Sequence, residues 1–334
     1  MSGATIDATS GETSGETSEA VSGAMSGATR DPSVPSIVVG CMPDDRGDDA
    51  VALAGVLARQ LGWGVTLAYV QPESWPGTPV GAVDAEWAAF LRAEADQILD
   101  GALRRLQVVA PDVPYRRTVH AHRGSGRGLG ELAELRGAAM VVVGSAPEGH
   151  HGRVAVGSTA DQLLHGSPVP VALAPWGYSA AVPERLSRTT LAFHRSARSA
   201  ATLMCGTLLS TRLGTRLRLL TVLARPKRFF GGLQHAGVEE QMFQVARDQM
   251  LTDLDDAAKS LGPRVAAEVE LAEGDDIPSA LSGADWADEL LVCSVSDAGP
   301  LTRVFVGDVS SKIIRSAGVP VVVFPRGARL DVWR

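Results

Sequence analysis

The stretch VVVGSAPEGHHGRVAVGSTADQLLHGSPVPV, residues 141–171, decides the fold of this chain. It begins inside an apolar run over 139–145 that predicts a buried strand, continues through a loop, and enters a helix predicted over 158–165. Gly157 stands just before that helix, which opens with a serine and a threonine. Free backbone N–H groups at a helix N-terminus favour negative charge, so this turn predicts an anion site suited to phosphate.

The same pattern recurs later in the chain, where residues 303–321 read RVFVGDVSSKIIRSAGVPV. Matching residues are 150 positions apart (303 − 153, 320 − 170), which indicates an internal duplication. The matched residues of the first copy are Arg153, Val154, Val156, Gly157, Val169, Pro170 and Val171, and those of the second are Arg303, Val304, Val306, Gly307, Val319, Pro320 and Val321.

Strands and helices alternate through both copies. In the first, apolar runs predict strands over 36–41, 65–70, 116–122, 139–145 and 169–174, and helical spacing predicts helices over 48–61, 85–107, 129–136 and 158–165. In the second, the strands are expected over 189–194, 216–223, 264–271, 289–294 and 319–324, and the helices over 197–213, 238–261 and 309–316, with a short one before 289. This alternation predicts an α/β protein with two tandem, open, five-stranded parallel sheets and helices on both faces.

The domain boundaries follow from shifts in composition. Residues 1–34 are rich in Ser, Gly, Thr and Glu and predict a disordered tail. Domain 1 is expected over 35–175, a linker rich in Pro and small residues over 176–188, domain 2 over 189–326, and a C-terminal tail over 327–334.

Residues 144–158 resemble the nucleotide-binding stretch of the universal stress protein (UspA-like) family, which reads G-x-x-G, nine residues, then G-[ST]. Gly144, Gly157 and Ser158 fall at that spacing, and Pro147 replaces the second glycine. The resemblance covers both copies and implies a tandem member with an adenine nucleotide alpha-hydrolase-like (Rossmann-like) fold. It also implies that the two domains pack as an internal pseudo-dimer through their last strands.

Carried onto this sequence, the resemblance implies ATP as the ligand of domain 1. Met42 and His194 stand where the family commonly has an aspartate after the first strand. In domain 2 the motif is degenerate, because Ser294, Asp297 and Asp308 replace two glycines and the serine, and a carboxylate at a helix N-terminus repels phosphate. ATP binding is therefore expected in domain 1 only. The residues expected to bind the nucleotide are Cys41, Met42, Val70, Val143, Gly144, Pro147, Gly157, Ser158 and Thr159.

The resemblance favours a regulatory or stress-response protein that acts by association with other proteins, with pairing of whole chains as a further expectation. No G-x-S-x-G or H-E-x-x-H motif occurs, so no catalytic residue is assigned. Two alternatives stay open. One is a nucleotide-dependent enzyme of the same fold group that hydrolyses ATP or adenylates a substrate, and the other is a partner subunit of a transporter or sensor that binds no nucleotide.

Other patterns favour structural interpretations over functional ones. GSGRGLG, residues 124–130, lacks the spacing of a phosphate loop and is expected to be a flexible loop, although Arg123 and Arg127 could face a ligand. A metal site built from histidines lacks partners at characteristic spacing, so surface or packing roles are favoured for His120, His122, His150 and His151. Compensation of helix N-terminal charge is favoured over magnesium binding for Asp44, Asp45, Asp48 and Asp49.

The bulk composition narrows the class of partner. The 334-residue chain carries a net charge of −7 and has only 5% aromatic residues, which argues against nucleic acid as a partner. No apolar run approaches the roughly 20 residues of a spanning helix, so no membrane insertion is expected. The three cysteines are far apart and the first basic residue is Arg30, which together predict a cytoplasmic protein without a secretory signal.

Overall fold

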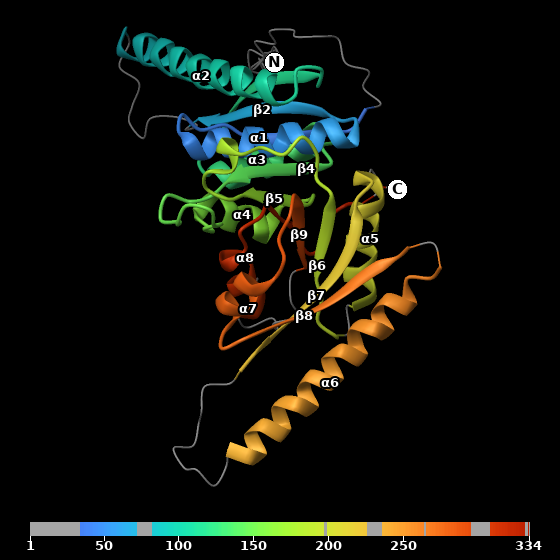
Figure 1. Cartoon of the computed structure of the whole chain (residues 1–334). Helices are drawn as coiled ribbons and strands as arrows, with labels where there is room; N and C mark the ends of the chain where they lie inside the picture. Colours follow the sequence, from blue (N-terminus) through green and yellow to red (C-terminus); the bar gives the residue numbers. More distant parts are fainter. Residues whose placement is uncertain are drawn as a thin grey trace, which may run out of the picture.

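In the computed structural model the two halves of the chain form one continuous sheet with helices on both faces (Figure 1). The structure describes residues 34–71, 82–196, 199–225, 236–263, 265–294, 308–330 and 333. The first half contains β1 (Ser36–Gly40), α1 (Asp45–Leu61), β2 (Gly64–Gln71), α2 (Ala82–Val109), β3 (Tyr115–Ala121), α3 (Ser125–Leu135), β4 (Met140–Gly144), α4 (Ser158–Gly166), β5 (Val171–Ala174) and the short 3-10 helix η1 (Tyr178–Ala180). The second contains β6 (Arg188–Ala192), α5 (Ser199–Leu213), β7 (Arg216–Ala224), α6 (Ala236–Ser260), β8 (Ala267–Gly274), α7 (Ile277–Gly283), β9 (Glu289–Ser294), α8 (Asp308–Ser316) and β10 (Val321–Phe324).

The strand order is β3-β2-β1-β4-β5-β10-β9-β6-β7-β8, and every neighbouring pair is parallel except β5 with β10. The α/β class and the two five-stranded parallel halves are therefore confirmed. The halves meet through their last strands, as the resemblance implied, and this contact joins them edge to edge. The antiparallel register pairs Ala172 with Val322, which are equivalent residues of the repeat (322 − 172 = 150). A pseudo-two-fold axis consequently passes between these two residues.

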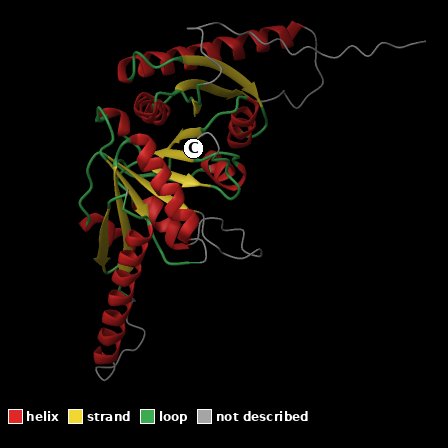
Figure 2. Cartoon of the chain, turned by 90° about the vertical axis from the view of Figure 1, so that its right-hand side faces the viewer, coloured by secondary structure: helices red, strands yellow, loops and turns green. Residues whose placement is uncertain are grey.

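Helices cover both faces of the sheet (Figure 2), and the core consists of two apolar layers, one on each face. One layer contains side chains from α1, α2, α5 and α6, for example Leu57, Leu106 and Leu254. The other contains side chains from α3, α4, α7 and α8, for example Leu163 and Ile314. The central strands are buried on both faces, which explains their unbroken valine-rich runs. Among the described helices, none combines the length and apolar character that crossing a membrane requires.

The segment expected as a linker, 176–188, lies against α1. The Asp49 carboxylate is fully buried and accepts hydrogen bonds from the backbone amides of Gly177 and Ser179, both at 2.7 Å. Further along, the Gln60 side chain accepts from the backbone amide of Leu186 at 2.9 Å. The expected N-terminal tail, except for Val34, lies outside the described residues.

Candidate functional site

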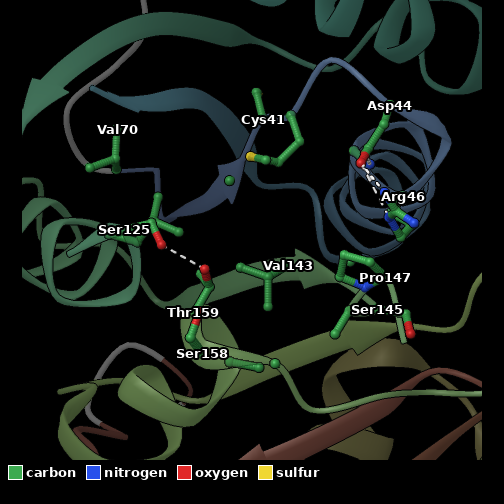
Figure 3. Close-up of a pocket in the computed structure, with 18 of the residues that line it drawn as sticks. Cys41, Asp44, Arg46, Val70, Ser125, Val143, Ser145, Pro147, Ser158 and Thr159 are labelled. Carbon is green, nitrogen blue, oxygen red and sulfur yellow. Dashed lines mark hydrogen bonds and ion pairs between the residues drawn. The ribbon is translucent and has the colours of Figure 1, made fainter. Parts of the chain in front are cut away.

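A cavity opens at the carboxyl ends of β1, β2 and β4, where open parallel sheets bind ligands (Figure 3). The space that it encloses, including the part open to solvent, is about 790 Å³. All nine residues expected to bind the nucleotide line it: Cys41, Met42, Val70, Val143, Gly144, Pro147, Gly157, Ser158 and Thr159. Sequence reasoning did not assign the other lining residues, which include Asp44, Arg46, Tyr69, Ser125, Leu129 and Ser145.

Two helix N-termini meet at this cavity. Both α3 and α4 begin after a glycine in extended conformation, Gly124 and Gly157, and glycine has no side chain to cap the first-turn amides. Ser125 is the first residue of α3 and Thr159 is the second of α4; both line the cavity, and their hydroxyl oxygens lie 2.6 Å apart (Figure 3). Two positive helix ends therefore face the same space, which suits an anionic group. The sequence had indicated only the second of them.

The motif glycines are required by the packing of the protein itself. A Cβ atom at Gly144 would lie 2.2 Å from the backbone oxygen of Arg46, and one at Gly157 would lie 2.7 Å from the Cβ of Ala146. These contacts press the first turn of α1 and the motif loop against the end of β4. The close approach between these protein segments accounts for both glycines.

The loop between Pro147 and Gly157 folds back on itself and is tied to the rest of the molecule. The Ser145 hydroxyl accepts from the amide of Ala155 at 2.8 Å, and Ala146 donates to the carbonyl of Ala155 at 2.9 Å. Farther out, Gly152 donates to the carbonyl of Trp176, and the Arg153 guanidinium donates to the carbonyl of Ser316 in domain 2. The end of the cavity formed by the motif loop is thus fixed to the seam between the domains.

The two charged side chains of the cavity wall, Asp44 and Arg46, pair with each other. Asp44 is the N-cap of α1 and accepts from the amide of Gly47 at 2.9 Å, while its second oxygen lies 2.5 Å from Arg46 Nη2. The expected compensation of helix charge therefore describes Asp44 well. Asp48 pairs instead with Arg105 on α2 at 2.9 Å. Asp49, as described above, holds the linker.

The segment GSGRGLG is helical, and the expectation of a flexible loop there was wrong. α3 begins at Ser125, four residues earlier than the helix predicted from residue 129. A Cβ at Gly126 would lie 2.3 Å from the carbonyl oxygen of Thr159, and one at Gly128 would lie 2.8 Å from the Cβ of His122. These glycines therefore serve the close packing of α3 on α4 and β3. Arg123 and Arg127 are not among the residues that line the cavity.

The four histidines weighed as metal ligands do not gather into one site. His120 Nε2 lies 3.1 Å from Glu131 Oε2, and His122 Nδ1 lies 2.9 Å from the backbone nitrogen of Gly124. His151 instead packs against Trp176, with ring centroids 5.9 Å apart. Within the part of the chain that the structure describes, no group of three or more His, Cys, Asp or Glu side chains is arranged to hold a metal ion.

The cysteines are packing residues. Burial raises the pKa of the Cys41 and Cys293 thiols to about 12 and that of half-buried Cys205 to about 11. Because the thiolate is the reactive form, we expect alkylation of the folded chain at pH 8 to be slow and to modify Cys205 first. Peptide mapping after timed iodoacetamide treatment tests this order. Modification of Cys41 as fast as Cys205 would contradict it, and a urea-unfolded sample, in which all three react, is the control.

Among the described residues of domain 2, a cavity opens at the end of β6. Phe193 and His194 follow β6 as Cys41 and Met42 follow β1, and they line this cavity together with residues of α6. Its remaining wall includes Asp253, which pairs with Arg195 at 2.7 Å. Of the motif positions in domain 2, Asp297 and the retained Gly307 lie outside the described residues, as do the side chains of Ser294 and Asp308.

Comparison with known proteins identifies the class. The model of the universal stress protein family matches residues 35–175 and 190–325, so the chain belongs to that family and carries two of its domains. A universal stress protein of Mycobacterium tuberculosis is 34% identical over 298 residues, which cover 87% of this chain and 99% of that protein.

Solved structures match the whole two-domain arrangement. A universal stress protein from Archaeoglobus fulgidus has a TM-score of 0.55 at 15% identity and covers 87% of this chain and 96% of its own. A putative universal stress protein from Pseudomonas aeruginosa has a TM-score of 0.54 at 13% identity and covers 90% and 96%. At these identities the likeness concerns the fold.

Proposed function

We propose that domain 1 of this universal stress protein binds an adenine nucleotide of the ATP type, and that nucleotide occupancy regulates its association with other proteins. The observation that carries the proposal is the convergence of two helix N-termini, at Ser125 and Ser158, each with a glycine as its N-cap residue, on one wall of the cavity. The resemblance of residues 144–158 to the family's nucleotide-binding stretch supports a phosphate site at the second of these ends.

Apolar side chains of the same cavity suit a purine ring. Val70, Leu129 and Val143 give it an apolar wall, and Met42, with 57% of its surface exposed, lies at the rim. A flat, largely apolar base would be buried there, while the phosphates would reach the helix ends. The alternative of nucleotide-dependent catalysis has weaker support, because Asp44, the one carboxylate among the residues lining this cavity, already caps α1 and pairs with Arg46.

ATP is expected to raise the melting temperature of the full chain by several degrees. A ligand at about 100 times its Kd stabilises the native state by roughly 2.7 kcal/mol. Ser158→Asp should abolish the shift, because a carboxylate at the start of α4 occupies the anion site and repels phosphate. Since acidic residues favour helix N-termini, this variant should still fold.

Three controls define the outcome. Ser158→Thr keeps the hydroxyl and should retain the shift, and Asp308→Ser in domain 2 should leave it unchanged. No shift in the wild-type chain at millimolar ATP would refute nucleotide binding, whereas turnover of ATP above background would favour the enzymatic alternative. Sedimentation of the same samples with and without ATP would show whether occupancy changes the pairing of whole chains, which we propose as one form of association.

We also propose a cytoplasmic location. Its support is the state of the three cysteines, which are free thiols in this fold.

A further inference from the structure

We propose that Arg46 binds a phosphate group of the bound nucleotide. In doing so, its guanidinium leaves the ion pair with Asp44 and forms one with the phosphate. This inference rests on the proposed function and concerns a residue outside the family motif. Arg46 is the one cationic side chain among the residues that line the cavity, and the ligand proposed there is strongly anionic. Helix ends alone supply partial charges, so a full positive charge at the same wall would add substantially to the recognition of phosphate.

The backbone places Arg46 directly over the motif. A Cβ atom at Gly144 would lie 2.2 Å from the backbone carbonyl oxygen of Arg46 and 3.3 Å from the Cβ atom of Arg46. The first turn of α1 is brought there by a second close approach, since a Cβ at Gly47 would lie 2.2 Å from the carbonyl oxygen of Met42. The root of the Arg46 side chain is therefore fixed at the end of β4, beside Ser145 and Pro147 (Figure 3).

The guanidinium is free to change partner at little cost. Its Nη2 and Nε atoms lie 2.5 and 3.2 Å from Asp44 Oδ2, and the two side chains are 25% and 34% exposed. Ion pairs exposed to this extent contribute little to stability. Asp44 keeps its hydrogen bond from Gly47 through the other oxygen, so α1 stays capped when the guanidinium leaves. A phosphate offers arginine two parallel charge-assisted hydrogen bonds in place of the single oxygen that Asp44 presents.

The residue at position 42 is consistent with a change of partner by Arg46 from Asp44 to a phosphate. Met42 stands where the resemblance places an aspartate, so the end of β1 contributes no carboxylate that would repel phosphate or hold Arg46. Asp44 is the single carboxylate among the lining residues, and its charge is the one that Arg46 neutralises before the ligand arrives.

The test is calorimetric titration of the full chain with ATP and, separately, with adenosine, which lacks phosphate. Arg46→Gln is expected to weaken ATP binding about tenfold or more, as for loss of a charged hydrogen bond, and to leave adenosine binding unchanged. Asp44→Asn keeps an N-cap acceptor but releases Arg46, so it should tighten ATP binding several-fold. Arg136→Gln removes the same charge from the exposed C-cap of α3, at the far end of that helix, and should match the wild type.

The outcomes separate this inference from the proposed function. If Arg46→Gln binds ATP as tightly as the wild type, or if its affinities for ATP and adenosine fall equally, Arg46 does not bind the phosphate. The proposal of nucleotide binding would remain supported in either case. If the wild-type chain binds neither compound, both ideas fail together. Opposite shifts in the Arg46 and Asp44 variants would support the exchange, and the Asp44 variant decides the matter if Arg46→Gln proves unstable.

Discussion

Replacing Glu289 with alanine is expected to lower the free energy of unfolding by about 3–5 kcal/mol, because it removes the buried carboxylate that two buried arginines share. Glu289, at the start of β9, is 1% exposed. One of its carboxylate oxygens lies 2.8 Å from Arg188 Nη2, and the other lies 3.0 Å from Arg218 Nη2. Both arginines are themselves buried, at the amino ends of β6 and β7.

Glu289 and the two arginines form a network that includes further side chains. The Thr190 hydroxyl donates to the same carboxylate, and Arg218 also donates to Glu270 at 2.6 Å and stacks over the ring of Trp286. The hydrogen bond to Glu289 is the main cause that raises the pKa of Arg188 above its ordinary value, against the opposing effect of burial. Removing the carboxylate therefore leaves the desolvation of both buried guanidiniums poorly compensated.

Urea unfolding followed by circular dichroism measures the effect. Glu268→Ala is the matched control, since Glu268 is 48% exposed and its closest cation is Arg216, at 3.2 Å, so its loss should cost less than about 1 kcal/mol. Glu289→Gln preserves the shape and part of the hydrogen bonding but not the charge, so it should fall between the two. Equal stabilities for Glu289→Ala and Glu268→Ala would show that the network is not holding this end of domain 2.

The periodicity of the sequence predicted the order of strands and helices because that order depends on which residues are apolar. The duplication predicted the pseudo-symmetry, and the antiparallel pair of Ala172 with Val322 lies on it. The buried ions could not be predicted in this way. Arg218 is the third residue of the apolar run over 216–223, and nothing local to that run shows that a carboxylate 71 positions away will cover it.

The candidate site likewise has features that the sequence predicted and features that it could not predict. The motif predicted the helix start at Ser158 because the residues that define it are adjacent in the chain. It could not show Ser125 or Arg46, whose place at the cavity depends on how α3 and α1 pack against β4. Glycine content misled the reading of residues 124–130, because glycine serves flexible loops and closely packed helices alike, and only the neighbours of Gly126 and Gly128 distinguish the two.

Trp333→Ala is expected to cost about 3–5 kcal/mol, although this residue belongs to the segment expected to be a tail. The Trp333 side chain is fully buried and meets Trp63 edge to face, with ring centroids 4.6 Å apart. Its indole N–H donates to the carbonyl of Ala139 in domain 1 at 3.1 Å, and its own carbonyl accepts from Arg212 on α5 of domain 2 at 2.6 Å. One residue near the C-terminus thus fastens both halves of the sheet together.

The expected loss of stability comes from ring packing and from the indole hydrogen bond, and separate variants can distinguish the two contributions. Trp333→Phe keeps an aromatic ring against Trp63 but loses the indole hydrogen bond, so it should cost less than Trp333→Ala. Trp87→Ala makes the same chemical change on α2, where Trp87 is 42% exposed, and should cost less than about 1 kcal/mol. Thermal unfolding of the four chains, wild type included, gives the ranking. If Trp333→Ala melts together with Trp87→Ala, the C-terminal residues do not hold the domains, because a cavity as large as an indole ring between two buried surfaces cannot form without a large loss of stability.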